Sequence, residues 1–191
     1  LRRQRQMCIR DRGAPLVPAF HQSVFGKPGE TALVLNIGGI ANLSVLGADG
    51  SALGFDTGTG NALMDGWCLR HTGKSYDESG RWAASGKVLP DLLAAMLGDP
   101  YLAQEPPKST GRDLFHADWL QRHLQQHPAQ AAAVDVQATL TEFTAASCAH
   151  AVQRFGRGGT ELLVCGGGAL NTYLMQRLAA LLPGVKVSST A

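Results

Sequence analysis

The distribution of apolar and polar positions divides the chain, from residue 31 onward, into a β-rich first part and a largely helical remainder. Three runs of continuous or alternating apolar residues come first: 32–37, 41–46 and 52–55. The turns between them are Gly38-Gly39 and Asp49-Gly50, and two-residue turns of this kind are typical of β-hairpins. The pattern therefore predicts a three-stranded antiparallel meander that ends at Asp56.

Apolar residues then recur with a spacing near 3.6, which indicates helices that bury one face. The first helix is expected between Asn61, as its cap, and Gly73, as its stop. Further helices are expected over these segments: 88–97, 117–126, 135–155 and 169–182. The last of them would present one stripe formed by Leu170, Leu174, Leu178 and Leu181. Two more strands are expected, a buried one over 161–165 and a final one that begins at Val185.

Strands and helices in this order, with glycines at strand ends, imply an α/β fold in which helices cover a mixed sheet. The order is that of one half of an actin-like (ribonuclease H-like) two-domain phosphotransferase. Residues 1–12 show neither period, and we interpret them as a foreign or disordered segment. The remainder, 13–191, is expected to be the second domain of such a protein, cut at both ends.

The composition is that of an ordinary globular protein, with 45% hydrophobic and 17% charged residues. The formal charge of +2 comes from residues 1–12, where five arginines stand against one aspartate, so that the rest of the chain carries −2. A mildly acidic body argues against nucleic acid binding. The four cysteines are widely separated, which favours free thiols and a cytoplasmic location, and no apolar run is long enough to predict a membrane span.

Asp56 is the strongest candidate for chemistry, because it follows an apolar strand and precedes the nearly bare loop Thr57-Gly58-Thr59-Gly60. A loop with few side chains lets a ligand approach the backbone closely. An aspartate there can serve as a general base at neutral pH. The alternative is an aspartate that caps a turn.

Two further glycine loops could contact phosphate. Asn36-Ile37-Gly38-Gly39 is either a plain hairpin turn or a loop for a terminal phosphate. Gly166-Gly167-Gly168 joins a strand to a helix, either as a nucleotide loop or, equally, as a tight turn without a ligand. A dinucleotide fingerprint fails at Asn171, where its third glycine would stand. Residues 107–112 hold donors suited to anions or, equally, solvated cations in a turn. His21 is interpreted as structural, and the histidine spacing does not predict a protein-bound transition metal.

Five motifs together resemble the anhydro-N-acetylmuramic acid kinase family of the sugar kinase/Hsp70/actin superfamily. They occur in family order within the following segments: 13–21, 35–42, 54–61, 107–112 and 164–169. The resemblance implies ATP- and Mg²⁺-dependent conversion of 1,6-anhydro-N-acetylmuramic acid to N-acetylmuramic acid 6-phosphate during peptidoglycan recycling. It also implies the sugar and ATP as partners, and it leaves a homodimer open.

The same resemblance implies roles for single residues. Asp56 would activate the water that attacks C1 of the sugar. Nucleotide-binding roles would fall to Asn36, Gly38, Gly39, Gly166, Gly167 and Gly168, and sugar-binding roles to Gly58, Gly60 and Asn61. Thr59 stands where the family motif FDTGPGN has proline, and the family's first phosphate loop, GTSxDG, has no match in this sequence. An actin- or Hsp70-like ATPase module and a non-catalytic interaction domain are the alternatives.

Overall fold

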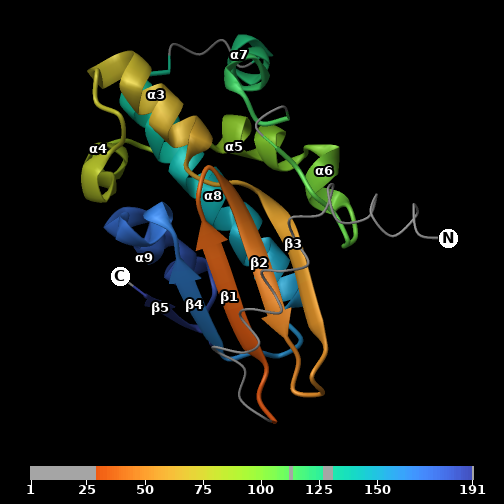
Figure 1. Cartoon of the computed structure of the whole chain (residues 1–191). Coiled ribbons are helices and arrows are strands. Elements are labelled where there is room, and N and C mark those ends of the chain that lie inside the picture. Colours follow the sequence, from red (N-terminus) through yellow and green to blue (C-terminus); the bar gives the residue numbers. More distant parts are fainter. Residues whose placement is uncertain (1–28, 112–113, 127–130, 191) are drawn as a thin grey trace, which may run out of the picture.

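The computed structural model describes residues 29–111, 114–126 and 131–190, and its core is one mixed five-stranded sheet (Figure 1). The strands lie in the order β3-β2-β1-β4-β5. Their bounds are β1 Ala32–Ile37, β2 Ile40–Leu46, β3 Ala52–Thr59, β4 Glu161–Cys165 and β5 Lys186–Ser189. β1, β2 and β3 form the predicted antiparallel meander, and β4 and β5 continue the sheet in parallel with β1.

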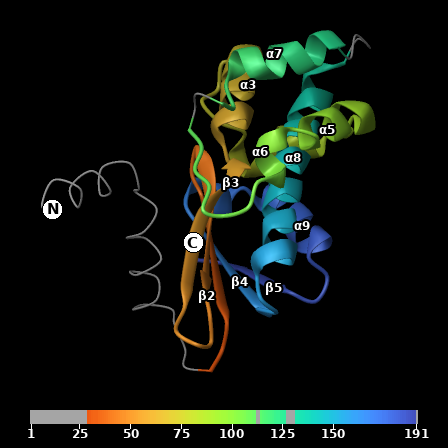
Figure 2. The ribbon, with the colours of Figure 1, turned by 90° about the vertical axis from the view of Figure 1, so that its right-hand side faces the viewer.

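The helices described by the structure gather on one face and at one end of this sheet. Their bounds are α3 Ala62–Thr72, α4 Arg81–Ala84, α5 Pro90–Leu97, α6 Pro100–Ala103, α7 Ala117–Gln126, α8 Ala133–Phe155 and α9 Thr172–Leu181, with 3₁₀ turns at η1 Glu78–Gly80 and η2 Gly167–Leu170. Figure 2 shows α8 and α9 on the same side of the sheet. The predicted bounds of α7 are confirmed, and α4 and α6 are additional short helices.

The core lies between the sheet and α8 because alternate strand residues on that face are apolar. Leu35, Leu43 and Phe55 stand side by side on β1, β2 and β3, and each is fully buried. Burial of one such side chain contributes about 1.5–3 kcal/mol. The Phe55 ring meets Phe155 of α8 edge to face, with 5.1 Å between centroids. The residues before and after these in each strand must therefore face the opposite side of the sheet.

The prediction that the third strand ends at Asp56 is wrong, because β3 continues to Thr59. Asn42 pairs with Asp56 and Ala41 with Gly58, so Thr57 is the extra residue of a β-bulge. Gly58 has φ +151°, a conformation that side chains rarely permit. The bulge turns Thr57 toward the helices, where its hydroxyl meets the Ala41 carbonyl and the thiol of Cys148.

The single helix expected over 169–182 is also wrong. The segment forms η2 and then α9, because Asn171 accepts the backbone N–H of Leu174 at 3.0 Å and starts a new helix at Thr172. Leu174 and Leu178 are fully buried as predicted, whereas Leu170 is 68% exposed. By contrast, Gly73 ends α3 with φ 73° and donates to the Leu69 carbonyl, which confirms the predicted stop.

Candidate active site

Strand register brings four side chains into one row across the sheet face opposite α8. Asn36 pairs with Cys165 on β4 and with Asn42 on β2, and Asn42 pairs with Asp56 on β3. Neighbouring strands are about 4.8 Å apart, so the backbones of Asn36 and Asp56 are about 10 Å from each other. The candidate base and the first residue of the predicted phosphate loop thus share one face.

The Asp56 carboxylate is held by hydrogen bonds from two parts of the chain. Oδ1 accepts the Asn42 side-chain N–H at 3.0 Å, and Oδ2 accepts both the Ser109 hydroxyl and the Thr110 backbone N–H at 2.9 Å. The backbone is fixed as well, since the Asp56 N–H donates to the Lys108 carbonyl and the Tyr101 hydroxyl donates to the Asp56 carbonyl. These contacts give the carboxylate a defined orientation.

Lys108 anchors the loop that supplies Ser109 and Thr110. Its side chain is buried, and Nζ donates to the carbonyls of Tyr101 and Leu102 at 3.2 Å each and lies 4.8 Å from the Tyr101 ring. Burial lowers the pKa of Lys108, with a smaller effect from the nearby Arg154 charge. Lys108 is therefore neither a solvated cation nor a donor to an external anion. Arg112 lies outside the described residues.

Two buried polar atoms beside the Asp56 carboxylate have no hydrogen-bond partner within the part of the chain that the structure describes. They are Asn42 Oδ1 and Thr110 Oγ1. Buried polar atoms in folded proteins are normally paired, if not by protein then by ordered water. Their position next to Asp56 marks this strip as a place where water or a hydroxyl-bearing ligand would complete the bonding.

The first glycine loop and the start of α3 are bonded to each other. The Asn61 and Gly60 N–H groups donate to the carbonyls of Gly38 at 2.7 Å and Gly39 at 3.0 Å. Asn61 occupies the N-cap position directly before α3, as predicted, but its side chain makes no capping hydrogen bond. It donates instead to the Ile37 carbonyl at 3.3 Å, because the β1–β2 turn lies directly beside it.

The second glycine loop packs on the first with no room for side chains. A Cβ on Gly166 would lie 2.5 Å from Asn36 Oδ1, and one on Gly168 would lie 2.4 Å from Ile37 Cγ2. Gly166 also has φ 83°. The structure thus brings together the predicted residues of both loops, together with Gly60 and Asn61. Gly58 is the exception, because the position that a Cβ atom would take at this residue faces Leu102 and Ser147 in the interior.

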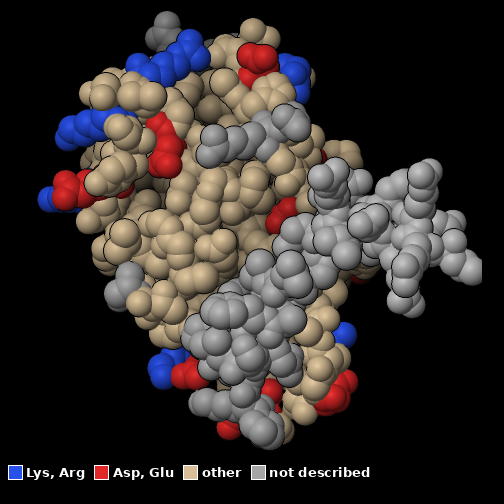
Figure 3. Space-filling model, viewed as in Figure 1, with Lys and Arg blue, Asp and Glu red and all other residues tan. Residues whose placement is uncertain are grey.

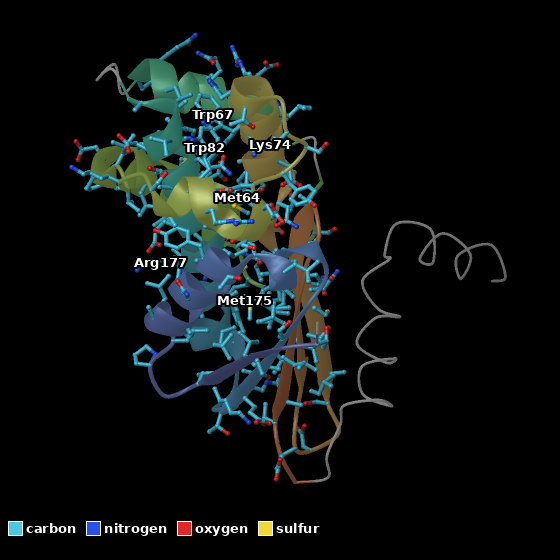
Figure 4. The ribbon with its side chains drawn as sticks, turned by 90° about the vertical axis from the view of Figure 1, so that its left-hand side faces the viewer. Met64, Trp67, Lys74, Trp82, Met175 and Arg177 are labelled. Carbon is cyan, nitrogen blue, oxygen red and sulfur yellow. The ribbon has the colours of Figure 1, made fainter. Side chains whose placement is uncertain are left out.

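α9, which follows the second glycine loop, is fixed to α8 by a two-pronged ion pair. Arg177 donates to both carboxylate oxygens of Glu142, at 2.6 and 3.0 Å. Hydrogen bonding and the negative charge of Glu142 raise the pKa of Arg177. Figure 4 shows Arg177 on α9, with Met64 and Trp67 on α3 and Trp82 on α4. The pair holds the helix behind the glycine loop in place.

Two cavities meet at this end of the sheet. One, of about 480 Å³, lies between α3 and α7 and is lined by Gly38 and Gly39 among others. The other, of about 370 Å³, is lined by η2 and the segment before α4, including the exposed side chains of Tyr76 and Leu170. Asn61, Asp65 and Gly167 line both cavities, whereas Asp56 is not among the described residues that line either.

Asp65 was not singled out by the sequence, although it lies one helical turn after Asn61. Its side chain is half-buried, and burial raises its pKa. Within the described part of the chain the carboxylate has no hydrogen bond or ion pair, although the Asp65 backbone N–H donates to the Asn61 carbonyl at 2.8 Å. Among the same residues, no group of three or more His, Cys, Asp or Glu side chains could hold a metal ion. A ligand in either cavity would meet the Asp65 carboxylate.

Charge is distributed unevenly on the face opposite α8. In the view of Figure 3, the visible Lys and Arg side chains lie near the margins, and the part of the centre that the grey atoms leave uncovered is mostly uncharged. Cys68, Cys148 and Cys165 are free thiols, as predicted. No helix within the described ranges has both the length and the apolar character of a membrane span.

Gly60→Ala is expected to lower the free energy of unfolding by about 2 kcal/mol or more, because the added methyl group would lie 2.2 Å from the Gly38 carbonyl oxygen. Gly66→Ala is the matched control, since Gly66 lies within α3 with nothing within 4 Å of the new Cβ. That change is expected to stabilise the protein by up to about 1 kcal/mol. Denaturant unfolding of both variants measures the difference. Equal effects would show that the loop contact does not constrain position 60.

Comparison with known proteins decides the family. A family model described as anhydro-N-acetylmuramic acid kinase matches residues 1–191. The chain belongs to the anhydro-N-acetylmuramic acid kinase family. A family member from Variovorax paradoxus is 56% identical over 194 residues, and one from Albidiferax ferrireducens is 52% identical over 208. Each comparison covers 98% of this chain but 51% and 53% of the relative, so the chain spans about half the length of these kinases.

Solved structures with the same fold have little sequence in common with this family member. Component A of (R)-2-hydroxyglutaryl-CoA dehydratase from Acidaminococcus fermentans matches with a TM-score of 0.56 at 12% identity. The activator of 2-hydroxyisocaproyl-CoA dehydratase from Clostridium difficile, solved with bound ADPNP, matches with a TM-score of 0.51 at 16% identity. Each of these two matches covers 91% of this chain and 59% of the solved chain. The predicted actin-like ATPase fold is confirmed.

Proposed function

We propose that this chain is the second domain of a kinase that converts 1,6-anhydro-N-acetylmuramic acid and ATP to N-acetylmuramic acid 6-phosphate and ADP in peptidoglycan recycling. The observation that carries the proposal is the family match over the whole chain. The site supports it, because an oriented carboxylate lies on the same sheet face as Asn36, which begins a glycine loop suited to phosphate.

Asp56 acts as the general base for opening the sugar. The oxygen of a water molecule forms a bond to C1, the bond between C1 and O6 breaks, and a water proton passes to the Asp56 carboxylate. O6 is then free to take the γ-phosphoryl group of ATP. Bound, aligned reactants make this transfer mainly a matter of positioning and charge stabilisation.

The two glycine loops hold the nucleotide. Gly38 and Gly39 admit the phosphates closely, since they present no side chain, and Gly166, Gly167 and Gly168 admit the adenosine side. Asn36 supports the junction of the two loops, where its Oδ1 lies close to Gly166. Gly58, Gly60 and Asn61 shape the sugar end of the cleft, Gly58 through the bulge that follows Asp56 rather than by contact.

Magnesium ions enter kinase sites with ATP and keep most of their ligands from phosphate and water, so one or two protein carboxylates suffice. The chemistry that Mg²⁺ supplies is neutralisation of phosphate charge. Asp65 fits this need, because its carboxylate, which has no partner among the described residues, lines both cavities beside Gly167. A negative charge so near a phosphate loop is unfavourable without a cation.

The proposal includes a cytoplasmic location, where the sugar and ATP are available, and leaves a homodimer open.

Residues 1–12 are proposed to contribute nothing to the fold. Their deletion is expected to leave the melting temperature unchanged, because the segment offers no apolar stripe that could pack on the acidic body. A fall of several degrees in a thermal scan would show that it packs.

The test uses this chain in place of the matching half of the Variovorax paradoxus relative, which gives a complete protein. The chimera is incubated with ATP, Mg²⁺ and 1,6-anhydro-N-acetylmuramic acid, and ³¹P NMR follows the sugar phosphate. Formation of the 6-phosphate is expected with this sugar and not with ADP in place of ATP. ATP hydrolysis that is independent of the sugar would favour an ATPase module. The absence of both activities would reject the kinase function.

A further inference from the structure

We propose that Asn42 and Ser109 are positioning residues for Asp56, and that they leave carboxylate oxygen Oδ1 as the atom that takes the proton from water. This inference rests on the proposed kinase function. It starts from the distribution of donors, since Asp56 receives one hydrogen bond on Oδ1 and two on Oδ2.

The two oxygens are not equivalent as bases. An ionised carboxylate offers about four lone-pair sites, two on each oxygen. The Ser109 hydroxyl and the Thr110 N–H occupy those of Oδ2, whereas the Asn42 amide occupies one on Oδ1. One acceptor site is left, and it is on the Oδ1 side, next to Asn42.

The surroundings of Asn42 support the same side. The Asn42 amide nitrogen faces Asp56, so its orientation is fixed, and its Oδ1 is a buried acceptor without a partner among the described residues. Buried acceptors of this kind are normally met by ordered water. A water molecule bound there would lie beside Asp56 Oδ1 and could donate one proton to each oxygen.

The strand register explains why Asn42 and Asp56 meet. Asp56 stands opposite Asn42 in the regular register that begins with Ala52 opposite Leu46, and the bulge at Thr57 comes only after this pair. Beyond the bulge, Gly58 pairs with Ala41 and the Gly60 N–H reaches the carbonyl of Gly39. The strand therefore presents the base on one face and closes the glycine loop at its end.

Apart from Asp56 itself, few charged or titratable groups in the described part of the chain lie near this carboxylate. Tyr101 donates to the Asp56 backbone carbonyl, and burial, together with the Asp56 charge, raises its pKa. Lys108 directs its Nζ at the α6 carbonyls, and Arg154 pairs with Glu105 at the outer side of the loop. Cys165 ends the row beyond Asn36, and burial raises the pKa of its thiol. The donors to the carboxylate itself are uncharged.

The test compares Ser109→Ala and Asn42→Ala in the chimeric kinase. Each change removes one hydrogen bond to an ionised group, so kcat is expected to fall about 10-fold while KM for ATP stays within about 2-fold. Ser109→Thr keeps the hydroxyl and is expected to restore kcat.

Ser85→Ala is the matched control, because it also removes one serine hydrogen bond, to the Trp82 carbonyl at 2.8 Å, far along the chain from Asp56. A kcat within about 2-fold of that of the parent chimera in a folded Ser109→Ala variant would overturn the inference. If Asn42→Ala does not fold, the comparison of Ser109→Ala with Ser109→Thr decides the question. Ser109 is exposed, so both of these variants are expected to fold. An inactive parent chimera would instead overturn the proposed function.

Discussion

Asp56→Asn is expected to lower the turnover of the complete kinase by at least about 10²-fold, because an amide cannot take a proton from the attacking water. The affinity for ATP and the melting temperature are expected to stay nearly unchanged. The structure gives a reason for the unchanged stability. The introduced amide would keep its oxygen toward Ser109 and Thr110, and its nitrogen could donate to Asn42 Oδ1 once the Asn42 amide turns over.

Steady-state kinetics, nucleotide titration and thermal unfolding of the same preparation measure the three quantities separately. Asp91→Asn is a suitable control for the exchange itself, because Asp91 is exposed in the first turn of α5. Turnover like that of the parent, or a loss explained wholly by unfolding, would return Asp56 to a structural role in β3.

Local sequence signals predicted the fold well where the structure is decided locally. The meander follows from alternation and from Gly38-Gly39 and Asp49-Gly50, and the end of α3 follows from Gly73, whose φ of 73° suits glycine. The errors occur where tertiary contacts decide. β3 runs past Asp56 because its continuation pairs with β2, and a leucine spacing could not reveal the break that Asn171 makes before α9.

The candidate site was predictable in its glycines and in Asp56, but not in the residues that hold Asp56. Ser109 lies 53 positions away in sequence, and its contact depends on the buried Lys108, which sequence composition suggests as a surface cation. Asn42 faces Asp56 only through the register in which β2 and β3 pair. Asn42 could have been noticed as a polar residue within an otherwise apolar strand pattern. Asp65 could have been noticed as a carboxylate one turn into α3.

The 191-residue chain by itself is expected to be inactive as a kinase, even when it is folded. Phosphoryl transfer needs donors around the transferring group, and this sequence has no match to the first phosphate loop of the family while spanning about half of its relatives' length. Aligned, enclosed reactants account for about 7 kcal/mol or more of barrier lowering, which a single open face cannot supply.

The same chain is expected to self-associate, because in the proposed two-domain arrangement the face that the other domain covers would be exposed and apolar in the isolated chain. The measurement is a coupled kinase and ATPase assay on the purified chain together with light scattering, with the Variovorax chimera as the active comparison. Activity that appears when the chain is mixed with the complementary half of that relative would show that the missing groups come from there. Robust turnover by the monomeric chain alone would mean that it already holds a complete site, and that the division of the cleft between two domains is wrong.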